Sequence, residues 1–117
     1  IAGSRSGFNV GEVYDAFLSA VERIGVKGVS EIVSGTCGGV DLFGEAIASW
    51  HDIKITRFPA DWEKYGKRAS YLRNKQMAEY ADALIAMVYN NSRGTEMMIK
   101  LAREKGLKVF VRRKNGN

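Results

Sequence analysis

An apolar segment in the last third of the chain constrains the fold more than any other feature. Residues 83–88 read ALIAMV and contain no polar side chain. A strand with one wet face alternates polar and apolar residues, so this run is typical of a strand covered on both faces. Such strands belong to parallel sheets, where helices cross over between neighbouring strands. The segment therefore predicts an α/β fold.

Weaker patterns on both sides of this segment indicate that strands and helices alternate along the chain. Apolar residues recur at helical spacing between Val10 and Ile24, and Gly25 follows as a stop signal. The expected helices lie over 10–24, 40–50, 69–80 and 95–105. The expected strands lie just before the loop that begins at Gly3 and over 31–34, 53–58, 82–88 and 107–111. We therefore predict a Rossmann-like, doubly wound parallel sheet of about five strands flanked by helices, formed by one domain over 1–117.

Composition restricts the class of protein and its partners. The chain is 45% hydrophobic and 26% charged, which is typical of a folded domain. We find no stretch long enough for a membrane span and no basic-then-apolar leader, and the single cysteine excludes an internal disulfide. One cysteine with one histidine does not make an ordinary zinc site. We expect a cytoplasmic protein without metal, cofactor or membrane contact. A net charge of +5 favours an anionic partner, and residues 112–114 are expected to be a solvated basic tail.

Three loops after the predicted strands combine glycine with hydroxyl or guanidinium groups. They read GSRSG over 3–7, SGTCGGVD over 34–41 and SRGT over 92–95. Because ligands of open parallel sheets lie beyond the carboxyl ends of the strands, these loops are expected at one edge. Helix N-termini there offer unpaired N–H groups and partial positive charge. A tight turn with a capping hydroxyl explains any one loop, whereas three together favour a phosphate site. Neither the Walker A pattern nor the G-x-G-x-x-G fingerprint is present.

Several side chains in and near these loops are candidates for ligand contact. Arg5 and Arg93 suit phosphate oxygens, and Asp41 and Asp61 suit ribose or base groups. Trp62 suits stacking on a base, although packing of its loop onto the sheet explains it equally well. The complete set of expected ligand-binding residues is Gly3, Ser4, Arg5, Ser34, Gly35, Thr36, Gly38, Gly39, Asp41, Asp61, Trp62, Arg73, Asn74, Ser92, Arg93, Gly94 and Thr95.

The motifs, taken in order, resemble the SLOG superfamily. The resemblance spans nearly the whole chain and is nearest to the small YspA-like branch of bacteria and phages. It rests on Gly3-Ser4-Arg5, Val33-Ser34-Gly35, Gly38-Gly39-Val40-Asp41, Phe58-Pro59-Ala60-Asp61-Trp62, Gly66-Lys67, Arg73-Asn74 with Met77, Tyr80-Ala81-Asp82-Ala83 and Ser92-Arg93-Gly94-Thr95. The resemblance implies a Rossmann-like domain that recognises nucleotides or their derivatives, in a homodimer.

The superfamily also includes the LOG phosphoribohydrolases and the DNA-processing protein DprA. LOG enzymes use an Arg shortly before a Met, which Arg73 and Met77 reproduce. They also use a Gly-Gly-x-Gly-Thr-x-x-Glu loop, in which this chain keeps the Gly-Thr pair but has Met98 in place of the catalytic Glu. The candidate catalytic residues are Arg73, Asp41 and the displaced Glu96.

Three functions follow from the sequence. The first is binding or sensing of a nucleotide-type small molecule through the glycine-rich phosphate loops. The second is LOG-like cleavage of a nucleotide N-glycosidic bond with a degenerate motif. The third is DprA-like binding of nucleic acid. We rank it last, because acidic residues are interleaved with the basic residues along the chain.

Overall fold

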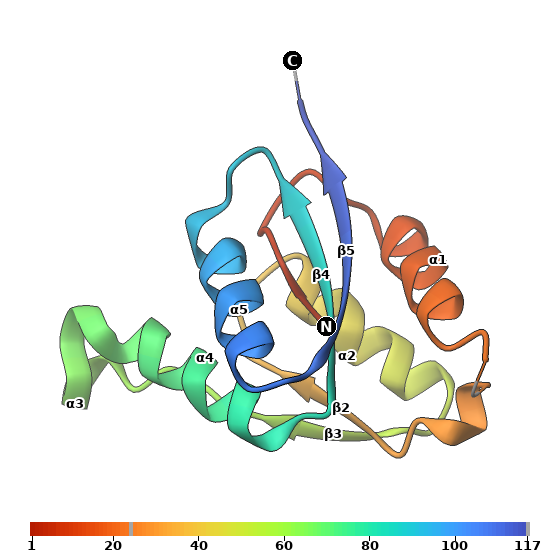
Figure 1. Ribbon diagram of the computed structural model, residues 1–117, viewed down its shortest axis with the longest axis horizontal. Coiled ribbons are helices and arrows are strands. Elements are labelled where there is room, and N and C mark those ends of the chain that lie inside the picture. Colours follow the sequence, from red (N-terminus) through yellow and green to blue (C-terminus); the bar gives the residue numbers. More distant parts are fainter. Residues whose placement is uncertain (24, 117) are drawn as a thin grey trace.

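The computed structural model of the chain describes residues 1–23 and 25–116 and alternates strands with helices (Figure 1). The strands are β1 (Ala2–Gly3), β2 (Glu31–Ser34), β3 (Lys54–Arg57), β4 (Ala83–Tyr89) and β5 (Lys108–Lys114). The α-helices are α1 (Val10–Ala20), α2 (Val40–Trp50), α3 (Trp62–Tyr65), α4 (Ala69–Tyr80) and α5 (Arg93–Glu104). Two short 3-10 helices are η1 (Val26–Gly28) and η2 (Gly66–Arg68). All paired strands run parallel, which confirms the α/β prediction.

The strands form two sheets, and the prediction of one sheet of about five strands is wrong. One sheet has the order β1-β4-β5, and the other pairs β2 with β3. Strand β1 has two residues, and both pair with β4, Ala2 with Ala86 and Gly3 with Met87. Among the described residues, β1 makes no ladder with β2, so the hydrogen-bonded sheet is interrupted there. Figure 1 shows β2 and β3 running in a different direction from β4 and β5.

Helices cover both faces of β4, and each face has its own apolar core. On one face, α1 and α2 pack against Ile85 and Met87. On the other face, α4 and α5 pack against Leu84, Ala86 and Val88. Figure 1 shows α5 on one side of β4 and β5, and α1 on the other. Successive side chains of β4 thus enter two different cores, which is why no polar residue interrupts this strand.

The boundaries of the helices agree with the sequence in two places and differ in two others. Helices α2 and α4 have the bounds predicted from their periodicity. The helix expected over 10–24 ends at Ala20, and residue 24 lies outside the described residues. Helix α5 begins at Arg93 rather than at Thr95, so Arg93 and Gly94 belong to its first turn.

The basic segment 112–114 is solvated as predicted, but it is part of β5, so the prediction of a tail is wrong. Strand β5 pairs with β4 along its whole length, up to Tyr89 opposite Lys114. Carboxylates on the neighbouring helices hold its cations in place. The ion pairs are Arg112–Asp15, Arg113–Glu96 and Lys114–Glu12. Strand pairing and these charges together extend the strand beyond its apolar part.

No helix in the described part of the chain combines the length and the apolar character needed to cross a membrane.

Candidate functional site

Hydrogen bonds from Ser4 join the loops that follow β1, β2 and β4 at the carboxyl ends of the strands. The Ser4 Oγ accepts from the Tyr89 N–H at 3.0 Å, at the end of β4. The Ser4 carbonyl accepts from the Val40 N–H at 3.3 Å, at the start of α2, and the Ser4 N–H donates to the Met87 carbonyl at 3.1 Å. We call the region formed by these three loops the carboxyl edge. Ser4 therefore uses both its backbone and its side chain to join the loops of the carboxyl edge.

Two glycines allow the loops to approach each other. Gly39 has φ +67°, and a Cβ there would lie 2.4 Å from the carbonyl oxygen of Arg5. A Cβ on Gly3 would lie 2.6 Å from the Met87 carbonyl oxygen and 2.8 Å from a methyl group of Val40. A Cβ on Gly38, by contrast, would meet nothing within 4 Å. Gly3 and Gly39 are thus required by packing alone, whereas Gly38 borders open space.

Ser34 anchors the loop after β2 from inside the protein. Its hydroxyl is buried, donates to Glu45 Oε2 at 2.6 Å and accepts from the Thr36 N–H at 3.1 Å. Glu45 also pairs with Arg57 of β3 at 2.9 Å. Thr36 has φ +61°, in the left-handed region that non-glycine residues rarely adopt. This network holds Thr36 in that conformation and leaves its side chain exposed.

Asp41 is a buried carboxylate in the first turn of α2. It is 6% exposed, and its Oδ2 accepts from the Cys37 N–H at 3.2 Å. Burial raises the pKa of Asp41, against the opposing effects of the Cys37 N–H and of the positive charges of the amino terminus and Arg73. A carboxyl group with a raised pKa releases its proton nearer to neutral pH. Asp41 therefore has the chemistry of an acid or base next to the loop after β2.

Arg73 joins α4 to the same loop. It is 6% exposed, and its Nη1 donates to the Gly35 carbonyl at 2.6 Å. Its Nε donates to Asn74 Oδ1 at 2.8 Å, and its Nη2 donates to Ser70 Oγ at 3.2 Å. Its Nη1 also lies 3.6 Å from the Cys37 Sγ. All three guanidinium nitrogens therefore have protein partners, which makes Arg73 a clamp on the loop rather than a free anion receptor.

Gly35 lies between the two buried charged groups. A Cβ at this position would be 2.9 Å from Asp41 Oδ2 and 3.1 Å from Arg73 Nη1. The glycine thus lets a carboxylate and a guanidinium flank one backbone segment. The structure brings Gly35, Asp41, Arg73 and Asn74 together, as the sequence motifs suggest.

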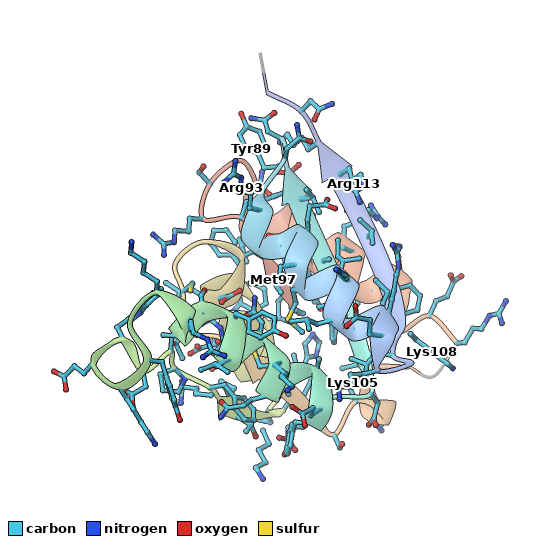
Figure 2. All side chains as sticks on the ribbon, turned by 60° about the vertical axis from the view of Figure 1, so that its left-hand side comes forward. Tyr89, Arg93, Met97, Lys105, Lys108 and Arg113 are labelled. Atoms are coloured by element: carbon cyan, nitrogen blue, oxygen red, sulfur yellow. The ribbon has the colours of Figure 1, made fainter. Side chains whose placement is uncertain are left out.

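The third loop leads into the N-terminus of α5. Ser92 precedes the helix, and its Oγ lies 3.0 Å from the buried Thr95 Oγ1. Gly94 is exposed in the first turn, and a Cβ on it would meet nothing within 4 Å. Figure 2 shows Arg93 and Tyr89 near one end of α5, with Lys105 and Lys108 near its other end. The exposed first turn of α5 thus adds backbone N–H donors to the carboxyl edge.

Arg5 and Arg93 are the cations of the carboxyl edge that face solvent. Both side chains are exposed, and within residues 1–23 and 25–116 neither guanidinium has a hydrogen-bond or ion-pair partner. Three cations of β5, by contrast, are paired with carboxylates: Arg112, Arg113 and Lys114. Two unpaired guanidinium groups on loops joined through Ser4 and Tyr89 make an anion-attracting edge.

Two predicted ligand residues lie away from the ends of β4 and β5. Asp61 and Trp62 belong to the exposed segment around α3, which Figure 1 places far from the ends of β4 and β5. The Asp61 carboxylate accepts from the Lys64 N–H at 3.1 Å and so caps α3. Trp62 is 55% exposed, so it does not pack its loop onto a sheet.

Glu96, the third candidate catalytic residue, is bound to Arg113. The hydrogen bond from this guanidinium lowers the pKa of Glu96, so its carboxylate is held in the charged form. Of the three candidate catalytic residues, only Asp41 is a carboxylate with a raised pKa.

Tyr89 belongs to the edge, although its sequence position did not distinguish a place at the pocket from packing. Its ring lies so close to Gly7 that a Cβ there would be 2.2 Å from it. The ring also meets Phe8 edge-on, with centroids 6.5 Å apart. The pattern that could have revealed it is an aromatic residue at the end of a buried strand, opposite a glycine-rich loop. Glu45 and Ser70 gave no such signal, because their roles depend on contacts between segments distant in sequence.

In the described part of the chain, no three His, Cys, Asp or Glu side chains gather closely enough to hold a metal ion.

Comparison with known protein families, with curated proteins and with solved structures found no match to this chain.

Proposed function

We propose that this chain is a domain that binds or senses a nucleotide or nucleotide-derived ligand, whose phosphate lies at the carboxyl edge. The observation that carries the proposal is the pair of exposed guanidinium groups of Arg5 and Arg93, for which the described part of the chain provides no hydrogen-bond or ion-pair partner. Arg5 lies on the loop after β1, which Ser4 ties to the end of β4, and Arg93 lies in the first turn of α5 just beyond that end. Ligands of parallel α/β folds bind at this edge. Guanidinium groups pair with phosphate oxygens in two-point contacts, which suits this arrangement.

Some of the other residues of the edge would contact the phosphate, and the rest hold the loop after β2 in its conformation. Backbone N–H groups around Gly38 and in the first turn of α5, with the Ser92 hydroxyl, are the additional phosphate donors. Ser34, Asp41, Arg73 and Asn74 hold the loop after β2 in shape. The resemblance to the SLOG superfamily supports this division, because several of its motif residues are those that build the loop. A Rossmann-like fold, a homodimer and a cytoplasmic location belong to the same proposal.

A second candidate function is cleavage of a nucleotide N-glycosidic bond. The buried carboxyl of Asp41, whose pKa burial raises, is the specific observation that favours it. Release of free base from a nucleotide panel, followed by chromatography, tests this candidate. Loss of that release in Asp41→Asn would assign the proton transfer to Asp41, whereas no release from any nucleotide would exclude the reaction.

Thermal unfolding against nucleotides, nucleotide sugars and cyclic dinucleotides tests the binding function. A ligand at about 100 times its dissociation constant adds roughly 2.7 kcal/mol of stability, which is easily seen in a small domain. We expect Arg5→Ala and Arg93→Ala to remove the shift. Arg103→Ala is the matched control, because Arg103 is exposed near the other end of the same helix. Equal shifts in Arg93→Ala and Arg103→Ala would place the ligand elsewhere, and no shift with any compound would contradict the function.

A further inference from the structure

A second exposed surface of this chain differs from the carboxyl edge in both position and chemistry. Every residue of the segment Asp61–Arg68, which we call the arm, is exposed. It contains α3 and η2 and projects away from both sheets (Figure 1). Trp62 is 55% exposed and Tyr65 is 41% exposed. Large aromatic side chains are seldom left in water, so their presence on a projecting segment indicates a contact surface.

The two aromatic rings leave the arm on the same side. Trp62 and Tyr65 are three positions apart within the single turn of α3, and residues at this spacing share one helix face. The spacing gives two neighbouring flat faces, with Tyr71 of α4 41% exposed on the following helix. Stacking on such faces is the interaction that bases of an unpaired strand make with proteins.

Cations accompany the rings. The arm carries Lys64, Lys67 and Arg68, and among the described residues none of the three forms an ion pair. Lys64 Nζ lies 5.1 Å from the centroid of the Tyr65 ring. One of the two acids of the arm, Asp61, is engaged as the cap of α3. Among the described residues, the arm thus offers positive charge without ion-pair partners, with Lys64 beside the Tyr65 ring, in a chain of net charge +5.

The residues of the arm disfavour a protein partner and a membrane surface as its binding partner. Five of the eight residues of the arm sequence DWEKYGKR are charged, whereas charged residues are depleted in the core of protein interfaces. Helix α3 has one turn, which is too short for an amphipathic helix that lies in a membrane surface. A polyanion with flat bases can form ionic contacts with the cations and stack on the aromatic rings.

We propose that the arm is a binding site for single-stranded nucleic acid, in which bases stack on Trp62 and Tyr65 and phosphates contact Lys64, Lys67 and Arg68. This site is separate from the carboxyl edge and does not depend on the small-molecule function proposed above.

Fluorescence anisotropy of a labelled oligo(dT) of about 12 nucleotides, titrated with the full chain, tests the proposal. Trp62→Ala and Tyr65→Ala should each weaken binding roughly 5- to 100-fold, since stacking on one aromatic residue contributes that much. Affinity should also fall steeply between about 50 and 200 mM salt because phosphate contacts release counterions. Trp50→Ala is the matched control, because Trp50 is 57% exposed but lies on α2. The affinity of this variant for the oligonucleotide should stay within about twofold of the wild-type affinity.

A spectroscopic measurement reports on the stacking itself. Trp50→Phe leaves Trp62 as the sole tryptophan, since the chain has two. Oligonucleotide should quench the fluorescence of this variant in step with the anisotropy. Three results would overturn the proposal: equal affinities of Trp62→Ala and Trp50→Ala, no binding at low salt, or quenching by phosphatidylserine-containing vesicles but not by oligonucleotide. Dissociation of a dimer by Trp62→Ala without any effect on oligonucleotide would reassign the arm to a second copy of the chain.

Discussion

The carboxyl edge and the arm contain similar types of residue but engage them in opposite ways. At the edge, the side chains of Asp41 and Arg73 are buried, and their polar atoms are bonded to loops and helices. In the arm, Trp62 and the neighbouring cations are exposed to solvent, and Asp61 caps a helix of a single turn. The difference teaches that residue type does not separate supporting groups from contact groups, whereas burial does. Substitutions that break the packing of Gly39 or the hydrogen bonds of Arg73 should therefore lower the free energy of unfolding, and substitutions in the arm should not.

Gly39→Ala should have the largest effect on stability. Its Cβ would lie 2.4 Å from the backbone oxygen of Arg5, and the residue would keep φ +67°. Steric overlap with backbone plus the left-handed strain should cost about 3 kcal/mol or more in urea unfolding. Gly94→Ala is the control, because its Cβ meets nothing within 4 Å and alanine suits a helix. Equal unfolding midpoints for the two variants would contradict the described contact between the loops.

Arg73→Ala should have the next largest effect. The substitution leaves the Gly35 carbonyl without its buried donor and removes the partners of Asn74 and Ser70. Buried groups without partners make a loss of about 2 to 3 kcal/mol the expected result of chemical denaturation. Arg68→Ala in the arm removes the same type of side chain from an exposed position. A similar loss in both variants would break the distinction between the edge and the arm.

Asp41→Asn should have a smaller effect, and it should depend on pH. Burial raises the pKa of the folded Asp41 carboxyl above its ordinary value of 3.8, so the folded protein takes up this proton first as the pH falls. The stability linked to that proton is complete below pH 3.8 and is lost as the pH rises through the folded pKa. Asp41→Asn avoids this loss, so it should be more stable than the wild type at pH 7, with the difference shrinking toward low pH.

Urea unfolding across this pH range measures the effect, with the exposed Glu79→Gln as the control for general charge removal. A stability difference for Asp41→Asn that grows as the pH falls would have the wrong sign for a buried carboxyl.

Trp62→Ala should have the smallest effect on stability. Because the ring is 55% exposed and α3 makes no buried contact of its own, the free energy of unfolding should change by about 0.5 kcal/mol or less. Thermal unfolding of the variant beside the wild type measures it. A loss comparable to that of Arg73→Ala would mean that the arm supports the fold.

The sequence predicted the helices well where one face is apolar or the ends carry stop signals. Helix α2 follows this rule, and Gly39 and His51 flank its observed bounds. Helix α3 and the 3-10 helices could not be predicted, because segments of three or four residues show no periodicity. The interruption between β1 and β2 was also hidden, since alternation along the chain does not determine which strands share hydrogen bonds.

The candidate site was predictable in its loops but not in the roles of its residues. Glycine next to hydroxyl groups marked the loops at 3–7, 34–41 and 92–95 because backbone approach requires it. The engagement of Arg73 by Gly35, and of Ser34 by Glu45, depends on contacts between segments distant in sequence. The exposure of Trp62 depends on where the arm projects, which no local pattern records.

The projecting arm also divides the chain into two parts, and these parts contact each other through residues outside the arm. The residues before the arm form α1, α2 and β1 to β3, and those after it form α4, α5, β4 and β5. Strand β1 nevertheless pairs with β4, and helices from the first part pack against Ile85 and Met87 of the second. Trypsin should therefore cut first at Lys64, Lys67 or Arg68, and the two fragments should stay associated. The same position would accept an inserted tag, or a split into two separately expressed pieces that reassemble.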